Sequence, residues 1–167
     1  MAKLKKSWRE KLQDRPSFPK VLRLEKGFPC YNAVHKMGAE VGDEIVLVNP
    51  SEVVAIMEKV PKGKLITIVE ICKQIAKNHG VKGCCSLTTG IFIMTAANAV
   101  EEASQEGGSL DIPYWRTLKV GGVLNEKYPG GVAAQAKRLR EEGHIIEPDK
   151  SGKPKRVKDF EKALVEG

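Results

Sequence analysis

The residues with the clearest potential for chemistry lie in the segment Ile112-Pro113-Tyr114-Trp115-Arg116. Its proline fixes the backbone, and two aromatic residues stand side by side before an arginine. Neighbouring side chains point to opposite faces of an extended strand, so at least one ring is expected to face a ligand or a partner surface. Arg116 is expected either to face the same ligand or to bond backbone carbonyls of the hairpin or wing predicted over 112–125.

A second candidate is the vicinal pair Cys84-Cys85, with His79 nearby in the sequence. Metal-binding cysteines are usually spaced by two to four residues, and a strained vicinal disulfide is rare. A helix N-terminus can depress the pKa of a thiol, but no basic partner is identifiable here. The pattern therefore favours buried thiols at a helix start, with no metal site and no cofactor. An enzyme that uses Cys84 or Cys85 as its thiol remains an alternative.

Other common catalytic sites are not indicated. The chain has only three histidines, His35, His79 and His144, and no credible Ser/His/Asp set. This scarcity argues against general acid–base enzymes. The pair Gly130-Gly131 lacks the sequence context of a nucleotide-binding glycine loop.

The charge of this 167-residue chain is concentrated at its ends. Residues 1–26 carry nine Lys/Arg against three Asp/Glu, whereas residues 27–136 carry ten against eleven. Residues 137–158 again carry an excess, eight against four. Basic ends around a neutral centre are typical of a protein that meets a polyanion, and solvated tails would show the same pattern.

The sequence predicts a protein of the cytoplasm. No run of eighteen apolar residues occurs, so no membrane span is expected. The N-terminus is basic but lacks the apolar stretch of a signal peptide. We therefore expect reduced thiols and a cytoplasmic location, close to the nucleoid if the protein binds DNA.

The N-terminal third reads as a basic flexible arm over residues 1–20 and a small β-containing extension over residues 21–50. Short strands are predicted at 21–24 and 42–50, because β-favouring residues are bounded there by turn formers.

The middle of the chain reads as helices. One is predicted from Glu52 to about Val60, and a second begins at a capping-box pattern, Thr67 to Glu70, and ends at Gly80. A third begins near Ser86 or Thr88 and runs to about residue 103. Two helices joined by a short glycine-containing turn form the outline of a helix-turn-helix, which many helical proteins share.

The remaining elements complete an α+β, winged helix-turn-helix-like fold with a strand-containing N-terminal extension. A hairpin or wing is predicted over 112–125 around Gly121-Gly122. A helix follows over 132–142 and stops at Gly143, and residues 147–167 are predicted to be a basic linker and tail.

Three blocks in residues 51–146 resemble the C-terminal domain of the methylated-DNA–cysteine alkyltransferases, and especially their non-enzymatic alkyltransferase-like relatives. The first is Val60-Pro61-Lys62-Gly63-Lys64-Leu65-Ile66-Thr67, similar to the family's Ile-Pro-x-Gly-x-Val-x-Thr segment. The second, 84–98, is similar in place to the recognition helix. The third and most specific is 112–116, followed by Gly122, Gln135, Leu139, Glu142 and Gly143, which looks like Ile-Pro-Cys-His-Arg and its closing Leu-x-x-Glu-Gly helix.

The departures from this family are informative. Its nucleophilic cysteine falls on Tyr114 and its histidine on Trp115, while its closing glutamate is kept as Glu142. Without a thiolate, alkyl transfer by this site is not expected. The family's phosphate-rotating tyrosine falls on Ile68, and the arginine that fills the gap left by a flipped base falls near Leu87. Both substitutions put base flipping in question, although an apolar wedge can also fill a base stack.

The resemblance implies a non-catalytic protein that binds double-stranded DNA and senses an alkylated or otherwise modified base for repair. The helix from about Ser86 would approach a groove, and the basic arms would neutralise phosphates. The implied base pocket comprises Pro113, Tyr114, Trp115, Arg116 and Glu142. The implied DNA contacts are Thr67, Ser86, Leu87, Thr88, Thr89, Asn98 and Lys119.

An alternative is an interaction module that uses the same fold to bind a protein or RNA. The losses at Ile68 and Leu87 favour it, and an acidic partner would explain the basic ends equally well.

Overall fold

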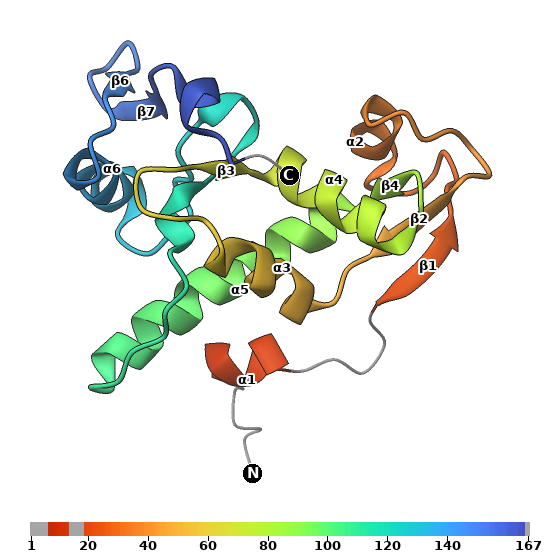
Figure 1. Ribbon diagram of the computed structural model, residues 1–167, viewed down its shortest axis with the longest axis horizontal. Helices are drawn as coiled ribbons and strands as arrows, with labels where there is room; N and C mark the ends of the chain where they lie inside the picture. The colour runs from red at the N-terminus through yellow and green to blue at the C-terminus, as the bar shows by residue number, and fades with distance from the viewer. Residues whose placement is uncertain (1–6, 14–18, 166–167) are drawn as a thin grey trace.

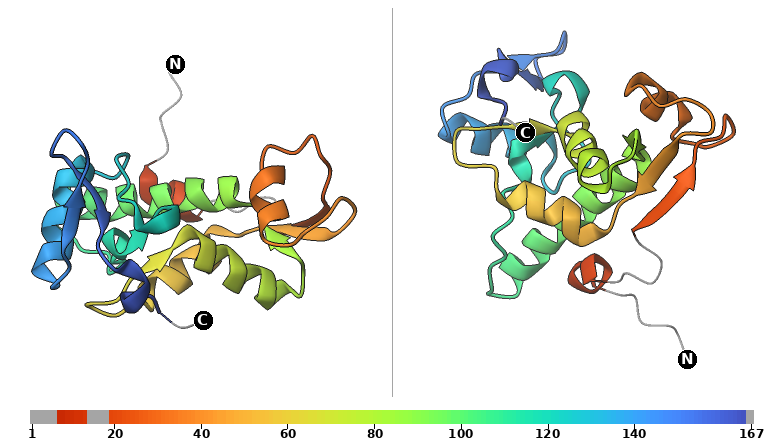
Figure 2. Two further views of the ribbon diagram at one scale, coloured as in Figure 1. Left: turned by 90° about the horizontal axis from the view of Figure 1, so that it is seen from above. Right: turned by 45° about the vertical axis from the view of Figure 1, so that its right-hand side comes forward.

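The computed structural model describes residues 7–13 and 19–165, and it is a mixed α+β structure with three small sheets (Figures 1 and 2). The first half contains α1 (Trp8–Gln13), β1 (Lys20–Arg23), α2 (Tyr31–Lys36), β2 (Glu44–Leu47), α3 (Pro50–Glu58), β3 (Ile66–Thr67), α4 (Ile68–His79) and β4 (Gly83–Cys84). The second half contains α5 (Ser86–Gln105), η1 (Tyr114–Arg116), β5 (Thr117–Leu118), η2 (Val120–Gly122), α6 (Gly131–Glu141), β6 (Ile146–Pro148), β7 (Pro154–Val157) and η3 (Phe160–Ala163).

The N-terminal extension shares its sheet with the helical centre. Strand β1 pairs antiparallel with β2, and β2 pairs parallel with β4, which is the turn between α4 and α5. Helix α2 packs near this turn, where Val34 lies 3.2 Å from the position that a Cβ of Gly83 would take. The extension is therefore attached directly to the point where the two central helices meet.

Part of the predicted arm is helical. Helix α1 lies against α5, where the carboxylate of Glu102 accepts hydrogen bonds from the backbone N–H groups of Trp8 and Arg9. The Arg9 side chain also pairs with Glu102 and Glu106. The rest of the arm, residues 1–6 and 14–18, lies outside the described residues.

The central helices follow the predicted periodicity. Thr67 caps α4 by accepting from the backbone N–H of Val69, and Gly80 ends the helix in the left-handed conformation that glycine adopts readily. The predicted cap of α5 is wrong, because the capping position is Cys85 and Ser86 is already the first helical residue.

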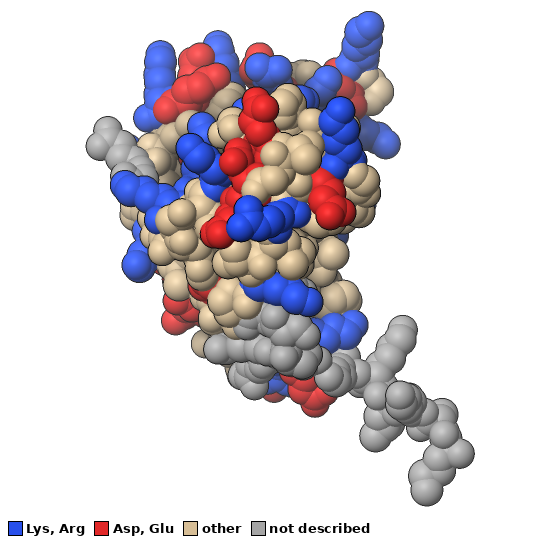
Figure 3. Space-filling model, turned by 90° about the vertical axis from the view of Figure 1, so that its right-hand side faces the viewer, with Lys and Arg blue, Asp and Glu red and all other residues tan. Residues whose placement is uncertain are grey.

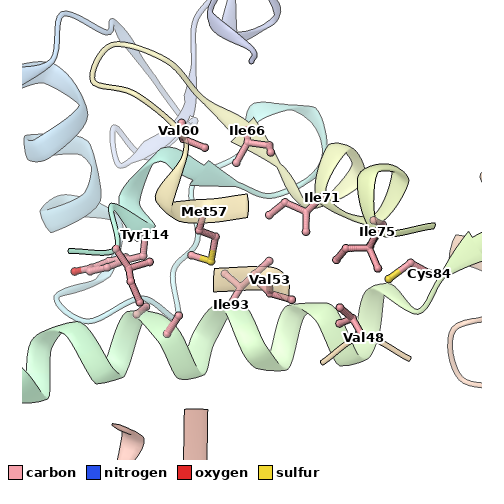
Figure 4. Packing of buried hydrophobic residues seen from close by; sticks show 14 of the residues in the cluster. Val48, Val53, Met57, Val60, Ile66, Ile71, Ile75, Cys84, Ile93 and Tyr114 are labelled. Carbon is pink, nitrogen blue, oxygen red and sulfur yellow. The ribbon is translucent and has the colours of Figure 1, made fainter. Parts of the chain in front are cut away.

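Figure 4 shows how the three helices meet. Val53 and Met57 of α3, Ile71 and Ile75 of α4, and Ile93 of α5 are buried together in one core. This shared burial fixes how α4 and α5 pack against each other and against α3.

The hairpin predicted over residues 112–125 does not form. The chain instead makes the 3₁₀ turn η1, the two-residue strand β5 parallel to β3, and a tight turn in which Gly121 has φ of 77°. The reason is local, because Pro113 precedes a helical turn rather than an extended strand.

Residues 146–157, whose composition predicts a flexible linker, form the antiparallel hairpin β6–β7. A third buried cluster holds the hairpin against α6, through Leu65, Leu118, Leu124, Ala136, Leu139 and Val157. Of the helices in the described part of the chain, none is long and apolar enough to cross a membrane.

Candidate nucleic-acid interface and aromatic site

Tyr114 lies in the core and not at a surface. Its side chain is 3% exposed, and its hydroxyl donates a hydrogen bond to Glu101 Oε1 at 2.7 Å. Its ring makes edge contacts with Trp115 and Tyr128. Burial, with the neighbouring carboxylate of Glu101, raises the pKa of Tyr114 above its ordinary value. The expectation that this ring faces a ligand is therefore wrong in this structure.

Trp115 and Arg116 converge on Glu142 at the end of α6. The indole N–H of Trp115 donates to Glu142 Oε2 at 2.7 Å, and Arg116 Nε donates to Glu142 Oε1 at 2.9 Å. The backbone N–H of Gly63 donates to the same carboxylate. Arg116 Nη1 also donates to the carbonyl of Val60 at 2.7 Å. Arg116 therefore joins its own segment to the end of α6 and to Val60, and the carbonyl that it bonds lies outside the expected wing.

This network also sets the charge of Glu142. Burial alone would raise its pKa, but the hydrogen bonds from Arg116, Trp115 and Gly63 outweigh burial, and the pKa of Glu142 is lowered. The glutamate therefore stays ionised at neutral pH, and it holds the indole and the guanidinium in place.

A cavity of about 430 Å³ lies beside this network, between the C-terminal half of α5 and the segment before η1. Pro113, Trp115 and Arg116 line it, together with two residues that the sequence did not indicate, Glu101 and Arg138. The guanidinium of Arg138 lies 4.3 Å from the centre of the Trp115 ring and 3.4 Å from Glu101 Oε1. Arg138 stands four residues before Glu142 on α6, and this helical spacing is the signal that could have indicated it.

Of the seven residues expected to contact DNA, four are partly or fully exposed and three serve the fold. Ser86, Leu87 and Thr88 lie in the first turn of α5, where Leu87 is 54% exposed, and Lys119 is exposed beside Glu126. Figure 1 shows this end of α5 on the side of the molecule that carries α2 and β4.

The other three serve the fold. Thr67 is buried as the cap of α4, and Thr89 is buried while donating to the carbonyl of Cys85. Asn98 is part-buried and donates to the carbonyl of Met94 within α5. The prediction of DNA contact is therefore corrected for Thr67 and Thr89, whose side chains are not accessible.

The accessible surface at the start of α5 is apolar. Helix α5 contains no lysine or arginine, and Ile91 is exposed one turn after Leu87. Val120 is 64% exposed and lines a groove of about 410 Å³ with Ile68. Lys36 of α2 and Lys73 of α4 also line this groove. The start of α5 thus exposes apolar side chains, and the neighbouring groove, which Ser86 also lines, has lysines at its edge.

The four cysteines are free and buried. Contact with Cys72, together with burial, raises the pKa of Cys84 far above its ordinary value. The thiols of Cys30 and Cys85 are also in contact. Within the described residues, no three His, Cys, Asp or Glu side chains are placed to hold a metal ion. A buried thiol with a raised pKa is a poor nucleophile, which argues against an enzyme based on Cys84.

His144 predicts a pH dependence of stability. Its Nε2 is buried and has no hydrogen-bond partner among the described residues, and burial lowers the pKa of His144 below its ordinary 6.5. The unfolded chain then binds a proton that the folded chain excludes, so stability is complete above pH 6.5 and falls as the pH is lowered below it. Urea unfolding at several pH values should show this loss. In the His144→Gln variant the loss should be smaller between pH 6.5 and the folded pKa, and superimposable curves would contradict the assignment.

The fold of this chain is similar to that of two solved structures. Its structural neighbours are S. pombe Atl1, an alkyltransferase-like protein, in complex with damaged DNA containing O6-carboxymethylguanine, and S. pombe ATL in complex with DNA. Both are 19% identical, and each match covers 71% of this chain and 94% of the neighbour, with TM-scores of 0.50 and 0.51. At this identity the likeness establishes a shared fold. No protein-family model and no curated protein matches the sequence.

Proposed function

We propose that this protein is a non-catalytic DNA-binding protein that recognises alkylated or otherwise modified bases in repair. The observation that carries the proposal is the fold, which is shared over 94% of the length of neighbours solved in complex with DNA. The network around Glu142 supports the resemblance to the alkyltransferase pattern, because Trp115, at the family's histidine position, donates to Glu142, at its closing glutamate position. The proposal thus rests on both fold and local geometry.

The absence of catalysis follows from Tyr114. This residue stands where the family has its acceptor thiol, and its hydroxyl is buried and bonded to Glu101. A phenol with a raised pKa is not ionised at neutral pH, so it cannot attack an alkyl group. Incubation with a duplex that carries O6-methylguanine should leave the intact mass of the protein unchanged. A gain of one methyl group would contradict this part of the proposal.

Recognition is assigned to the apolar surface at the start of α5. Leu87, Ile91 and Val120 offer apolar contact rather than the hydrogen-bonding side chains that read base edges. Such a surface suits an alkyl group or an unstacked base, and an exposed leucine can fill a gap in a base stack. This assignment replaces the aromatic pocket around Tyr114.

Leu87→Glu tests this assignment. The substitution places a negative charge where a DNA groove is expected, so duplex affinity should fall by roughly tenfold or more because of charge repulsion. Val21→Glu is the matched control, since Val21 is an exposed apolar residue on β1. Fluorescence anisotropy with a labelled duplex measures both. Equal affinities of the two variants would show that α5 does not face DNA.

A second candidate function is an interaction module for a protein or RNA. The specific observation in its favour is that α5 carries no basic side chain and exposes Leu87 and Ile91. A comparison of duplex DNA, single-stranded RNA and a neutral polymer in one binding assay separates the two candidates. Binding to RNA with no binding to the duplex would favour the second.

A further inference from the structure

The β6–β7 hairpin is an ordered element that projects from the C-terminal part of the fold (Figures 1 and 2). Its turn is fixed by Asp149, whose carboxylate accepts from the backbone N–H groups of Ser151 and Lys153. Val157 is 1% exposed and anchors the strand in the core. The hairpin therefore has a defined geometry, although its composition is that of a flexible tail.

The hairpin is also bonded to the segment that follows η2. The backbone N–H of Leu124 donates to the carbonyl of Lys155 at 2.8 Å, and Val123 forms an antiparallel bridge with Arg156. These contacts join the hairpin to the chain that carries Val120, one of the exposed apolar residues assigned to recognition. The hairpin is thus held in a fixed position relative to the loop that carries Val120.

Exposed basic side chains crowd the hairpin. The hairpin and the residue after it, 146–158, carry five basic side chains and two carboxylates, so the carboxylates do not cancel the positive charge. Glu147 pairs with Arg156 at 3.5 Å, and Asp149 is occupied by the turn. Among the described residues, Lys150, Lys155 and Lys158 form no ion pair. The five exposed cations are Lys150, Lys153, Lys155, Arg156 and Lys158.

The placement of this charge matches the proposed interface. In Figure 1 the hairpin and α2 lie at opposite ends of the long axis, both along the upper side, and the loop around residue 120 lies between them. By contrast, Figure 3 shows the face at the α2 and β1 end with acidic and basic side chains interspersed. Within residues 146–158, five basic side chains stand against two carboxylates, so the hairpin end carries a local excess of positive charge.

We propose that the β6–β7 hairpin is a second contact to double-stranded DNA, in which Lys150, Lys155 and their basic neighbours neutralise backbone phosphates of the same duplex that the start of α5 contacts. The inference rests on the proposed function and names a further part of its interface. Lysines on a rigid hairpin suit the evenly repeated phosphates of a duplex and carry no sequence preference. Helix α5 has no basic residue of its own, so the hairpin would provide charge that the helix lacks.

The test compares two double variants of the full chain. Lys150→Gln with Lys155→Gln removes two hairpin charges, while Lys59→Gln with Lys77→Gln removes two exposed charges just after α3 and on α4, outside the basic ends and the assigned interface. Duplex affinity is measured against salt concentration by fluorescence anisotropy. Each lost phosphate contact makes the plot of log affinity against log salt less steep by about 0.9. The slope of the hairpin variant should therefore be less steep by about two, and its duplex affinity roughly ten- to fiftyfold weaker. The control should keep the parent slope.

The outcomes are distinguishable. If the parent binds the duplex and the hairpin variant keeps its slope, the hairpin inference is wrong and the proposed function stands. If the parent shows no salt-dependent binding, the proposed function itself fails.

Equal losses in both double variants would show a general effect of net charge, and equal losses on duplex DNA and single-stranded RNA would show a general polyanion surface. Either result would overturn the assignment to duplex DNA. The thermal unfolding of both double variants should match that of the parent, because none of the substituted lysines is buried.

Discussion

Replacing Glu142 by glutamine is expected to lower the free energy of unfolding by about 3–5 kcal/mol, the usual cost of breaking a buried ion pair. The side chains of Arg116 and Glu142 are only 14% and 7% exposed, so neither charge is well solvated once its partner is removed. The glutamine keeps the shape of the side chain but leaves the Arg116 guanidinium without a counter-ion, and the bond from Trp115 is weakened. Urea unfolding measures the change.

Two controls make this prediction specific. Glu141→Gln changes the preceding, exposed carboxylate and should cost less than about 0.5 kcal/mol. The effect of Glu142→Gln should also depend on pH. The folded pKa of Glu142 lies below its ordinary 4.5, so the stability from its charge is present above pH 4.5 and is lost as the pH falls through the folded value. A difference between parent and variant that does not shrink in acid would contradict the ion-pair account.

The second large effect is expected at Gly122. A Cβ at this position would lie 2.5 Å from two ring atoms of Phe160, and the backbone φ of 77° is itself unfavourable for other residues. Gly122→Ala should therefore cost about 2–4 kcal/mol, from overpacking and from the left-handed backbone. Chemical denaturation measures this cost. This result would identify η2 as the point where the turn that carries Val120 packs against Phe160 of the C-terminal segment.

The adjacent glycine is an unusually close control. Gly121 has the same φ of 77°, but a Cβ there would meet no atom within 4 Å. Gly121→Ala should cost only the backbone term, about 1–2 kcal/mol. Phe160→Ala should remove most of the additional cost of Gly122→Ala when the two are combined, because the clash is with that ring. Equal costs at the two glycines would show that Phe160 does not constrain the turn.

The helices of the centre could be predicted because their signals are local. The Thr67 cap, the left-handed Gly80 and the apolar periodicity between them need no information from the rest of the chain. The short strands could not, since β3 and β5 each have two residues and pair with each other about fifty positions apart. The β6–β7 hairpin has the composition of a solvated tail, and its order comes from Val157 and from bonds to residues 123 and 124.

Only part of the candidate site could be predicted from the sequence. The pattern of the segment 112–116 with Glu142 indicated which residues belong together, and the structure brings Trp115 and Arg116 onto that glutamate. Whether a ring is buried depends on packing between elements distant in the sequence, so the core position of Tyr114 could not be foreseen. The four-residue spacing to Glu142 could have indicated Arg138, but its contact with Glu101 could not be predicted because it requires α5 and α6 to meet.

The central claim, that this protein binds DNA without transferring an alkyl group to itself, is tested most directly by a salt titration of duplex binding. A labelled duplex, with and without one O6-methylguanine, is titrated with the unmodified protein from low to moderate ionic strength. The account predicts reversible binding that weakens linearly with log salt, and tighter binding to the modified duplex. Absence of salt-dependent binding to either duplex would contradict it.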